Sequence, residues 1–300
     1  MSVMALDPIL SRRAEVQRLA SGSLHRRQRR SHIAIVLCVA CIAIALVPLI
    51  AIVVYTVERG LGAWSVAFFT HLPTPAGIPG GGIENSIIGS LIIDAVAVAG
   101  AVPIGVLTGL FLAESESRIA AAVRFAADVM SGMPSILIGV FAYGLLVTTM
   151  HHFSAIAGSF AIGFLMLPVI IRASETAIRT VPNDLSEAGL ALGAKRASIA
   201  RRVVVPAALP GLITGLLLAI ARGMGETAPL LFTAIGSQYL SYSLAGPMAA
   251  MPVTVYLDGI QAYPDLQRTA WGTALLLLIV VLVLSVSARV VSARLGRKHG

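Results

Sequence analysis

The sequence is poor in charged and in aromatic side chains. Only 12% of its 300 residues are Asp, Glu, Lys or Arg and only 6% are aromatic, whereas 57% are hydrophobic. The mean hydropathy is +0.89. Because about a quarter of the residues of a soluble domain are charged, this composition excludes an ordinary soluble protein. It is typical of a chain that folds within a lipid bilayer.

Lysine is scarce as well, and this excludes an ATPase site. Lys195 and Lys298 are the only lysines, and neither ends the pattern G-x-x-x-x-G-K-[ST] that binds nucleotide phosphates. The histidines form no H-E-x-x-H zinc motif, and the G-x-S-x-G pattern of serine hydrolases is absent. We therefore predict that the chain is not an enzyme and holds no cofactor or metal.

The chain has only two cysteines, Cys38 and Cys41. Their C-x-x-C spacing suggests redox or metal chemistry in a soluble domain. Here they lie within an apolar run that offers no other soft ligand. We interpret them as small hydrophobic residues and infer no disulfide.

Long apolar runs are abundant. A helix needs about 20 mostly apolar residues to cross a hydrocarbon core of ~30 Å. Six windows come close to or exceed this length, so we predict an all-α polytopic membrane protein with six transmembrane helices. The first window is too long for a cleaved signal peptide. The six are Ile33–Val57, Ile87–Ala113, Asp128–Met150, Ala155–Ile171, Leu209–Ile235 and Thr269–Val290.

Basic residues alternate between the two sides of these helices. The gaps rich in Lys and Arg are the N-terminal tail, residues 172–208 and the C-terminal tail. The positive-inside rule therefore places both termini in the cytoplasm. The net charge of +8 has the same origin and requires no nucleic acid. We divide the chain into a basic N-terminal tail (1–32), a first transmembrane helix (33–57), a core of five helices (84–290) and a C-terminal tail (291–300).

The cytoplasmic loop 173–208 has the composition of a helical hairpin. Pro182 suits a helix start, and Gly193 suits the left-handed position that ends a helix. A basic second helix, Lys195–Val205, should then stop at Pro206. An ordered hairpin at the membrane surface predicts a docking element.

The same loop resembles a segment of the membrane subunits of type I ABC importers, E-A-A-x3-G-x9-I-x-L-P. Glu187, Ala188 and Gly193 match it at the right spacing, and Pro206 closes it. Three positions depart mildly from the pattern: Gly189, Val203 and Val205. The resemblance implies that the first short helix fits a groove on a separate ATP-hydrolysing subunit.

Further segments narrow the resemblance. "GGGIENSIIGSL", "LPVIIRASETAIRTVP", "AIARGMGETAPLLFTA" and "MPVTVY" together resemble the permeases of phosphate-specific ABC importers, over most of residues 80–290. This implies the MetI-like permease fold and a place in the plasma membrane of a prokaryote. It implies alternating access driven by ATP, with inorganic phosphate as substrate. The implied partners are a second homologous permease, two ATP-binding cassette subunits and an extracytoplasmic phosphate-binding protein.

Two opposite charges stand inside the predicted helix Leu209–Ile235. Arg222 and Glu226 are four residues apart, so a continuous helix would place them on one face. Charges at this depth usually face a bundle interior or an aqueous path. We predict that Arg222 receives the oxyanion and that Glu226 is its resting partner. The alternative is a static ion pair that fastens helices.

Other residues extend this prediction. Arg172 is a candidate second anion-binding residue on the path. Asp94 is a candidate further partner of Arg222. Gly223, Gly225 and Pro229 weaken the helix beside the charged pair, since Pro lacks the amide hydrogen and Gly adds backbone freedom. Pro134 should likewise interrupt the third helix.

Three other functions stay open at this point. One is an ABC importer of another oxyanion, such as sulfate or molybdate. Another is a secondary transporter that uses Arg222 and Glu226 as a proton relay and needs no docking loop. The third is a membrane scaffold or sensor without any flux. The sequence also leaves open whether specificity lies in this chain or in the binding protein.

Overall fold

The structure is a computed structural model that describes residues 7–78 and 80–296. These residues form helices, loops and one isolated β-bridge, between Ile235 and Met248. The chain divides into two compact units, residues 1–55 and 56–300. Each unit is described by itself.

The first unit consists of most of helix α1, Asp7–Leu61. This helix contains the predicted first span, and its apolar part, Arg30–Leu61, has a mean hydropathy of 3.2. It begins at Asp7, so it also includes most of the predicted N-terminal tail. Cys38 and Cys41 are free thiols on its surface.

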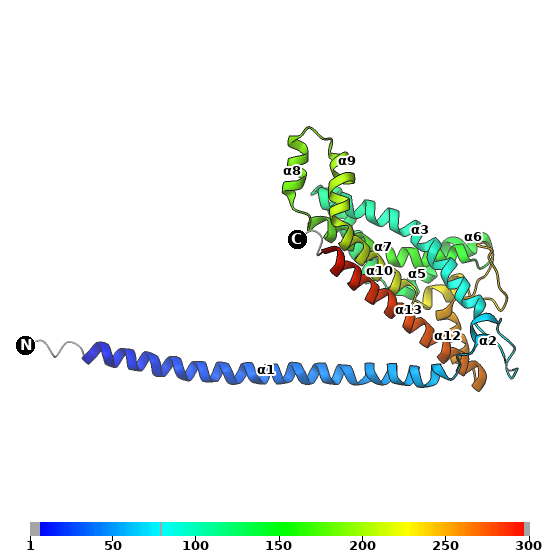
Figure 1. Cartoon of the computed structure of the whole chain (residues 1–300), viewed down its shortest axis with the longest axis horizontal. Coiled ribbons are helices and arrows are strands. Elements are labelled where there is room, and N and C mark those ends of the chain that lie inside the picture. The colour runs from blue at the N-terminus through cyan, green and yellow to red at the C-terminus, as the bar shows by residue number, and fades with distance from the viewer. Residues whose placement is uncertain (1–6, 79, 297–300) are drawn as a thin grey trace, which may run out of the picture. The chain divides into compact units, whose positions relative to one another are not determined.

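Four long helices form the body of the second unit. They are α3 (Glu84–Glu114), α7 (Ala155–Arg179), α10 (Val205–Gly223) and α13 (Pro264–Gly296). Helix α7 packs against both α3 and α10, and α10 packs against α13 (Figure 1). Helices α7 and α13 extend beyond the predicted apolar windows because charged residues at the membrane surface continue the same helices.

Small residues set the close packing of α3 on α7. Cβ atoms added to Gly105 and Gly109 would lie 2.5 Å from side-chain atoms of Ile170 and Ser174. Since the contacting positions advance together along both helices, α3 and α7 run parallel. Small residues at such interfaces let helix backbones approach closely in a membrane, where packing replaces the hydrophobic effect.

The predicted helix Asp128–Met150 is interrupted at Pro134, as predicted, but it is two separate helical stretches, and the first begins earlier, at Arg118. The chain forms α4 (Arg118–Gly132) and then a second helical stretch, Ser135–Met150, bent by 104° from the first. The stretch comprises α5 (Ser135–Ala142), the π-helix η1 (Tyr143–Val147) and α6 (Thr148–Met150). The break falls at Met133 and Pro134, because proline has no amide hydrogen and its ring clashes with the preceding turn.

The number of spans depends on this bent pair. Within the described residues, five helices are long and apolar enough to cross a membrane, or six if the bent pair is one span. The protein is therefore an all-α polytopic membrane protein.

The predicted helix Leu209–Ile235 is wrong as well. Helix α10 ends at Gly223, and a separate short helix, α11, spans Ala228–Thr233. Conversely, Pro206 does not stop the preceding helix. Helix α9 (Arg196–Ile199), the π-helix η2 (Ala200–Val204) and α10 form one span, Arg196–Gly223. Pro206 lies inside this span, two residues after the π-helix η2, so the regular hydrogen-bond pattern is already changed where its amide hydrogen is missing.

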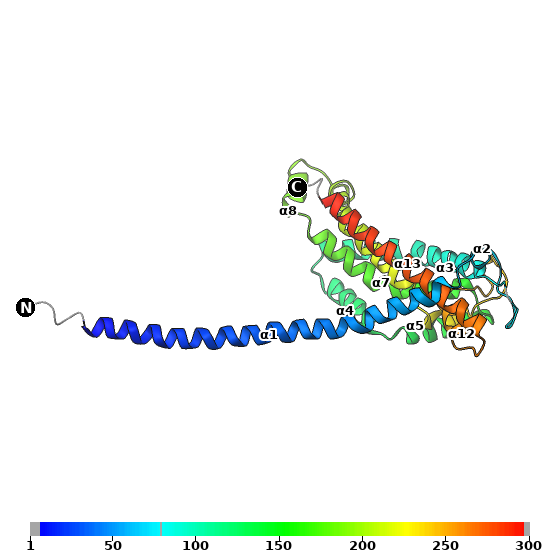
Figure 2. The ribbon, with the colours of Figure 1, turned by 60° about the horizontal axis from the view of Figure 1, so that its bottom comes forward.

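The two ends of the second unit differ. Helices α8 (Asn183–Ala191) and α9 project from one end, whereas α2 (Val66–Thr70) and α12 (Met251–Gly259) lie at the other. Figure 2 shows the same separation from another side.

Much of the long apolar loop between α11 and α13 packs on the bundle. The amides of Ala155 and Ile156 donate to the carbonyls of Gly246 and Leu244 at 2.9 and 3.0 Å. Its irregular backbone is thus paired with the first turn of α7. This is how non-helical backbone is tolerated at membrane depth.

Candidate functional site

The hairpin after α7 is built around one left-handed glycine. Gly193 has a φ of 78° and follows Leu192, the C-cap residue of α8. Its amide donates to Leu190 O at 2.9 Å, and the amide of Ala194 donates to Gly189 O at 3.1 Å. These two bonds form the Schellman motif that terminates a helix. The chain can therefore reverse into α9 without strain, because glycine has no Cβ.

The outer surface of this hairpin is unusually apolar. Leu192 is 88% exposed, and Leu185 and Leu190 are each 44% exposed. Glu187 and Ala188 are exposed beside them. The opposite side is packed, since a Cβ on Gly189 would lie 2.9 Å from Ile199. Clustered exposed leucines on a polar hairpin indicate an interaction surface.

The break between α10 and α11 holds the two charges inside the span. Arg222 is exposed in the last turn of α10, and Glu226 is half-buried in the connection before α11. The prediction that they share one helix face is wrong, because α10 ends between them. Among the described residues no ion pair joins them, and Asp94, a buried residue of α3, does not pair with Arg222 either.

The break lies at mid-depth of the bundle. A Cβ on Gly223 would lie 2.0 Å from Met166 Cε, and Met166 is near the middle of α7. On the other side of the break, a Cβ on Gly139 of α5 would lie 2.8 Å from Pro229 Cα. Both glycines thus allow a close approach of neighbouring elements, and α11 is held against α5 and α7. An exposed arginine at this depth faces a partner subunit or an aqueous path, since facing lipid is costly.

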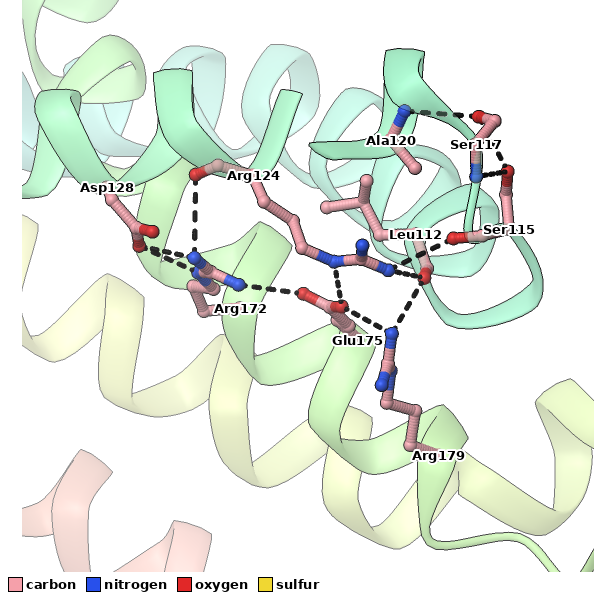
Figure 3. Close-up of polar contacts among 9 residues, drawn as sticks. All are labelled: Leu112, Ser115, Ser117, Ala120, Arg124, Asp128, Arg172, Glu175 and Arg179. Atoms are coloured by element: carbon pink, nitrogen blue, oxygen red, sulfur yellow. Dashed lines mark hydrogen bonds and ion pairs between the residues drawn. The ribbon is translucent and has the colours of Figure 1, made fainter. Parts of the chain in front are cut away.

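Arg172 belongs to a network of charges that the sequence reasoning did not find. Figure 3 shows the carboxylate of Glu175 among three guanidinium groups. Arg124 Nε lies 2.7 Å from Glu175 Oε1, Arg172 Nη1 3.0 Å from Oε2, and Arg179 Nη2 3.1 Å from Oε1. Arg172 also forms an ion pair with Asp128 of α4. The Glu175 side chain is only 7% exposed.

Two of these arginines also bind carbonyl groups at the C-terminal end of α3. Arg124 and Arg179 both donate to the carbonyl of Leu112, the latter at 3.2 Å, and Arg124 donates to Ser115 O at 3.1 Å. Carbonyls in the last turn of a helix lack partners within the helix and carry partial negative charge, which cations satisfy. The network therefore fastens α3, α4 and α7 immediately before the hairpin.

A sequence signal for part of this network exists. Arg172, Glu175 and Arg179 are spaced i, i+3 and i+7, which places them on one face of a helix. The signal is visible only if α7 continues past Ile171, as it does in the structure. Arg124 and Asp128 come from α4, more than 40 residues earlier.

A bundle of membrane helices with an ordered hairpin at one end and charged residues at a mid-depth break is typical of a membrane subunit of a transporter. Residues 101–298 match the family described as binding-protein-dependent transport system inner membrane component. The match covers most of the chain, and the chain belongs to this family.

Within this family, several curated relatives are named phosphate transport system permease protein PstA. The protein from Yersinia pestis is 38% identical over 275 residues, 91% of this chain and 92% of that protein. The one from Haemophilus influenzae is 40% identical over 235 residues, 78% of this chain and 83% of that protein. PstA 1 from Mycobacterium tuberculosis is 36% identical over 214 residues, 70% of each chain.

Solved structures support the MetI-like fold. A chain of the MetNI methionine ABC transporter, in an inward-facing conformation, has a TM-score of 0.53 at 22% identity and covers 70% of this chain and 93% of its own. A chain of an amino acid ABC transporter crystallised with histidines has a TM-score of 0.50 at 20% identity, with 71% and 92% covered. At these identities the likeness shows the fold alone.

Proposed function

We propose that the chain is the permease of an ATP-driven, binding-protein-dependent importer of inorganic phosphate. The relatives named PstA, which match up to 91% of the chain, carry the substrate assignment. The exposed Arg222 at the mid-depth break supports it chemically, because guanidinium supplies paired donors and a permanent charge to an oxyanion.

The chain has no P-loop, so ATP hydrolysis belongs to a partner. We propose the partners to be a PstC-like second permease, two PstB-like ATP-binding cassette subunits and a PstS-like extracytoplasmic phosphate-binding protein. Both termini would lie in the cytoplasm of a prokaryotic cell with α8 and α9, as the positive-inside distribution indicates. An external signal from a reporter fused to Gly300 would exclude this orientation.

Phosphate uptake by proteoliposomes that contain the whole complex tests the function. We expect accumulation only with internal ATP and external binding protein, and no competition by excess sulfate or molybdate. Competition by sulfate or by molybdate would instead indicate that the competing oxyanion is the substrate. Uptake that needs an ion gradient and no ATPase subunit would instead support a secondary transporter.

The hairpin residues Glu187, Ala188, Gly189 and Gly193 are proposed to dock on the ATPase. Gly193→Val should lower co-purification of the ATPase subunit by about tenfold, because a β-branched side chain is strained at a φ of 78°. The helix end and the Leu192 surface would then shift. Gly100→Val is a matched control, since a Cβ added at Gly100 would have nothing within 4 Å and its φ is not positive. Normal co-purification and uptake in Gly193→Val would contradict the docking assignment.

On this proposal, Arg222 lines the phosphate path and Glu226 lowers the cost of its charge when no anion is bound. Among the described residues no ion pair joins Arg222 and Glu226, so neither the static pair nor the resting pair is seen, and the proposal rests on the exposure of Arg222 at the break. Arg172 is proposed as a second basic station nearer the cytoplasm. Its two carboxylate partners, Asp128 and Glu175, would have to release it for an anion to bind.

A further inference from the structure

A cavity lies at the end of the bundle opposite the hairpin formed by α8 and α9. It has a volume of about 650 Å³ and is enclosed by α2, the loop before α3, α12 and the first turns of α13. On the proposed orientation this end faces the outside of the cell. Neither Arg222 nor Glu226 lines it, so it is distinct from the site at the break.

Two carboxylates line this cavity. Asp258 comes from α12 and Asp265 from the first turn of α13. Asp265 accepts a hydrogen bond from the amide of Gly77 at 2.8 Å, which holds the loop before α3 in place. The side chain of Asp258 forms no hydrogen bond or ion pair with any residue in the described part of the chain. Burial and the nearby charge of Asp265 raise the pKa of Asp258 to about 6.

Within the described chain, no basic side chain forms an ion pair with either carboxylate. The charged lining residues are Asp258, Asp265 and Arg268, and Arg268 donates to the carbonyl of Gly62. From α3, only the neutral Asn85 and Ser86 face the cavity. Ser86 Oγ is already bonded to Thr254 Oγ1 at 2.7 Å. The cavity therefore holds two carboxylates against one guanidinium, and Asp258 is partly desolvated in it.

The chain around the cavity carries exposed tyrosines. Tyr239 follows the lining residue Gln238 and is 78% exposed, and Tyr263 lies between the lining residues Gln261 and Asp265 and is 51% exposed. Tyrosine is enriched in protein–protein interfaces, where it supplies a large amphipathic surface. A pocket with spare negative charge and tyrosines beside it fits a protein that inserts a basic side chain.

We propose that this cavity receives a lysine or arginine side chain of the extracytoplasmic binding protein. The inference rests on the proposed function, because it names the docking point of a partner which that function requires. The basic group enters between Asp258 and Asp265, and Tyr239 and Tyr263 contact the partner around it. Docking then requires ionised Asp258 and weakens in acid.

The test uses the complete transporter in lipid nanodiscs and measures ATPase stimulation against the concentration of binding protein. Asp258→Asn should raise the half-maximal concentration about tenfold with an unchanged maximal rate, as for loss of one buried ionic contact. Glu84→Gln is the matched control, because Glu84 begins α3 at the same end but does not line the cavity. Its half-maximal concentration should stay within about twofold of wild type.

The pH dependence gives a second readout. Asp258 is ionised above its pKa of about 6 and protonated below it. The wild-type half-maximal concentration should therefore fall as pH rises from about 5 to about 7.5, whereas Asp258→Asn should lose most of this change. Comparing the variant with wild type at each pH removes titration of the binding protein itself.

The outcomes separate this proposal from the proposed function. If wild type is not stimulated by the binding protein at all, the proposed function fails. If wild type is stimulated and Asp258→Asn behaves identically, only the docking site fails, and the tyrosines then belong to the membrane–water boundary. If Asp258→Asn instead releases the second permease from the purified complex, the cavity is a subunit interface and the proposal is overturned.

Discussion

Phosphate uptake should fall by at least about 100-fold when Arg222 is replaced by Gln, although the complex still assembles. Removing a preorganised charge that stabilises an anion in a water-poor site costs about two to three orders of magnitude in rate in enzymes. An arginine that stabilises a phosphate ion as it crosses the membrane acts by the same electrostatic interaction. Gln keeps donors and part of the length but not the charge. Uptake by reconstituted complexes at matched expression is the measurement.

Arg118→Gln is the control for this experiment. Arg118 begins α4 and is exposed, and the variant removes the same charge away from the break. It should retain at least about half of the wild-type uptake, as for an exposed surface charge. Equal losses in both variants would mean that the effect of Arg222→Gln is not local.

Uptake by Glu226→Gln and by the double variant Arg222→Gln/Glu226→Gln shows whether these residues line the anion path or form a static ion pair that holds helices together. On the path hypothesis, both variants transport poorly, because the double variant still lacks the anion-binding charge. A static pair predicts the reverse, since removing both charges leaves no buried charge without a partner. Near-normal uptake by the double variant would therefore assign the pair to helix fastening and refute the path.

Hydropathy was sufficient to predict the class of the protein and the approximate position of its spans. It was insufficient at Pro134 and at Gly223, where apolar sequence continues but the helix does not. A window of apolar residues measures transfer to the membrane and not the continuity of the hydrogen-bond ladder. The same limit explains why α7 was predicted to end at Ile171, since its last turns are charged but remain helical.

The turn at Gly193 was predictable because helix ends are local. Its left-handed φ and two Schellman bonds depend on residues within one turn. The relation between Arg222 and Glu226 was not predictable in this way. Their spacing has meaning only on a continuous helix, and tertiary packing of Gly223 on Met166 accompanies its end.

The charge network required tertiary information for a different reason. Its central carboxylate, Glu175, has two partners on its own helix and one on α4, which is brought close by the bend at Pro134. No local rule pairs Arg124 with Glu175 across 51 residues. The bend and the network are thus connected, because α4 turns away from α5 at the bend and brings Arg124 and Asp128 against α7.

Replacing Glu175 by Gln should destabilise the protein more than any other single neutralisation in this network. The side chain is 7% exposed and forms ion pairs with three arginines, so the variant leaves these charges without their shared partner. Removing one member of a buried ion pair costs about 3–5 kcal/mol. The partial exposure of Arg172 and Arg179 reduces this to about 3 kcal/mol or less.

Asp128→Asn is the matched comparison, because it also removes a carboxylate from Arg172. The Asp128 side chain is 60% exposed and has this one ion-pair partner within the described chain, so its loss should cost less than about 1 kcal/mol. The thermal unfolding midpoint of the purified complex should fall by roughly 5–10 °C for Glu175→Gln and by less than about 3 °C for Asp128→Asn. Because Arg124 and Arg179 hold the end of α3 through Leu112, the larger fall should be accompanied by faster proteolysis in residues 113–118. Equal midpoints for the two variants would show that burial of Glu175 adds nothing to the network.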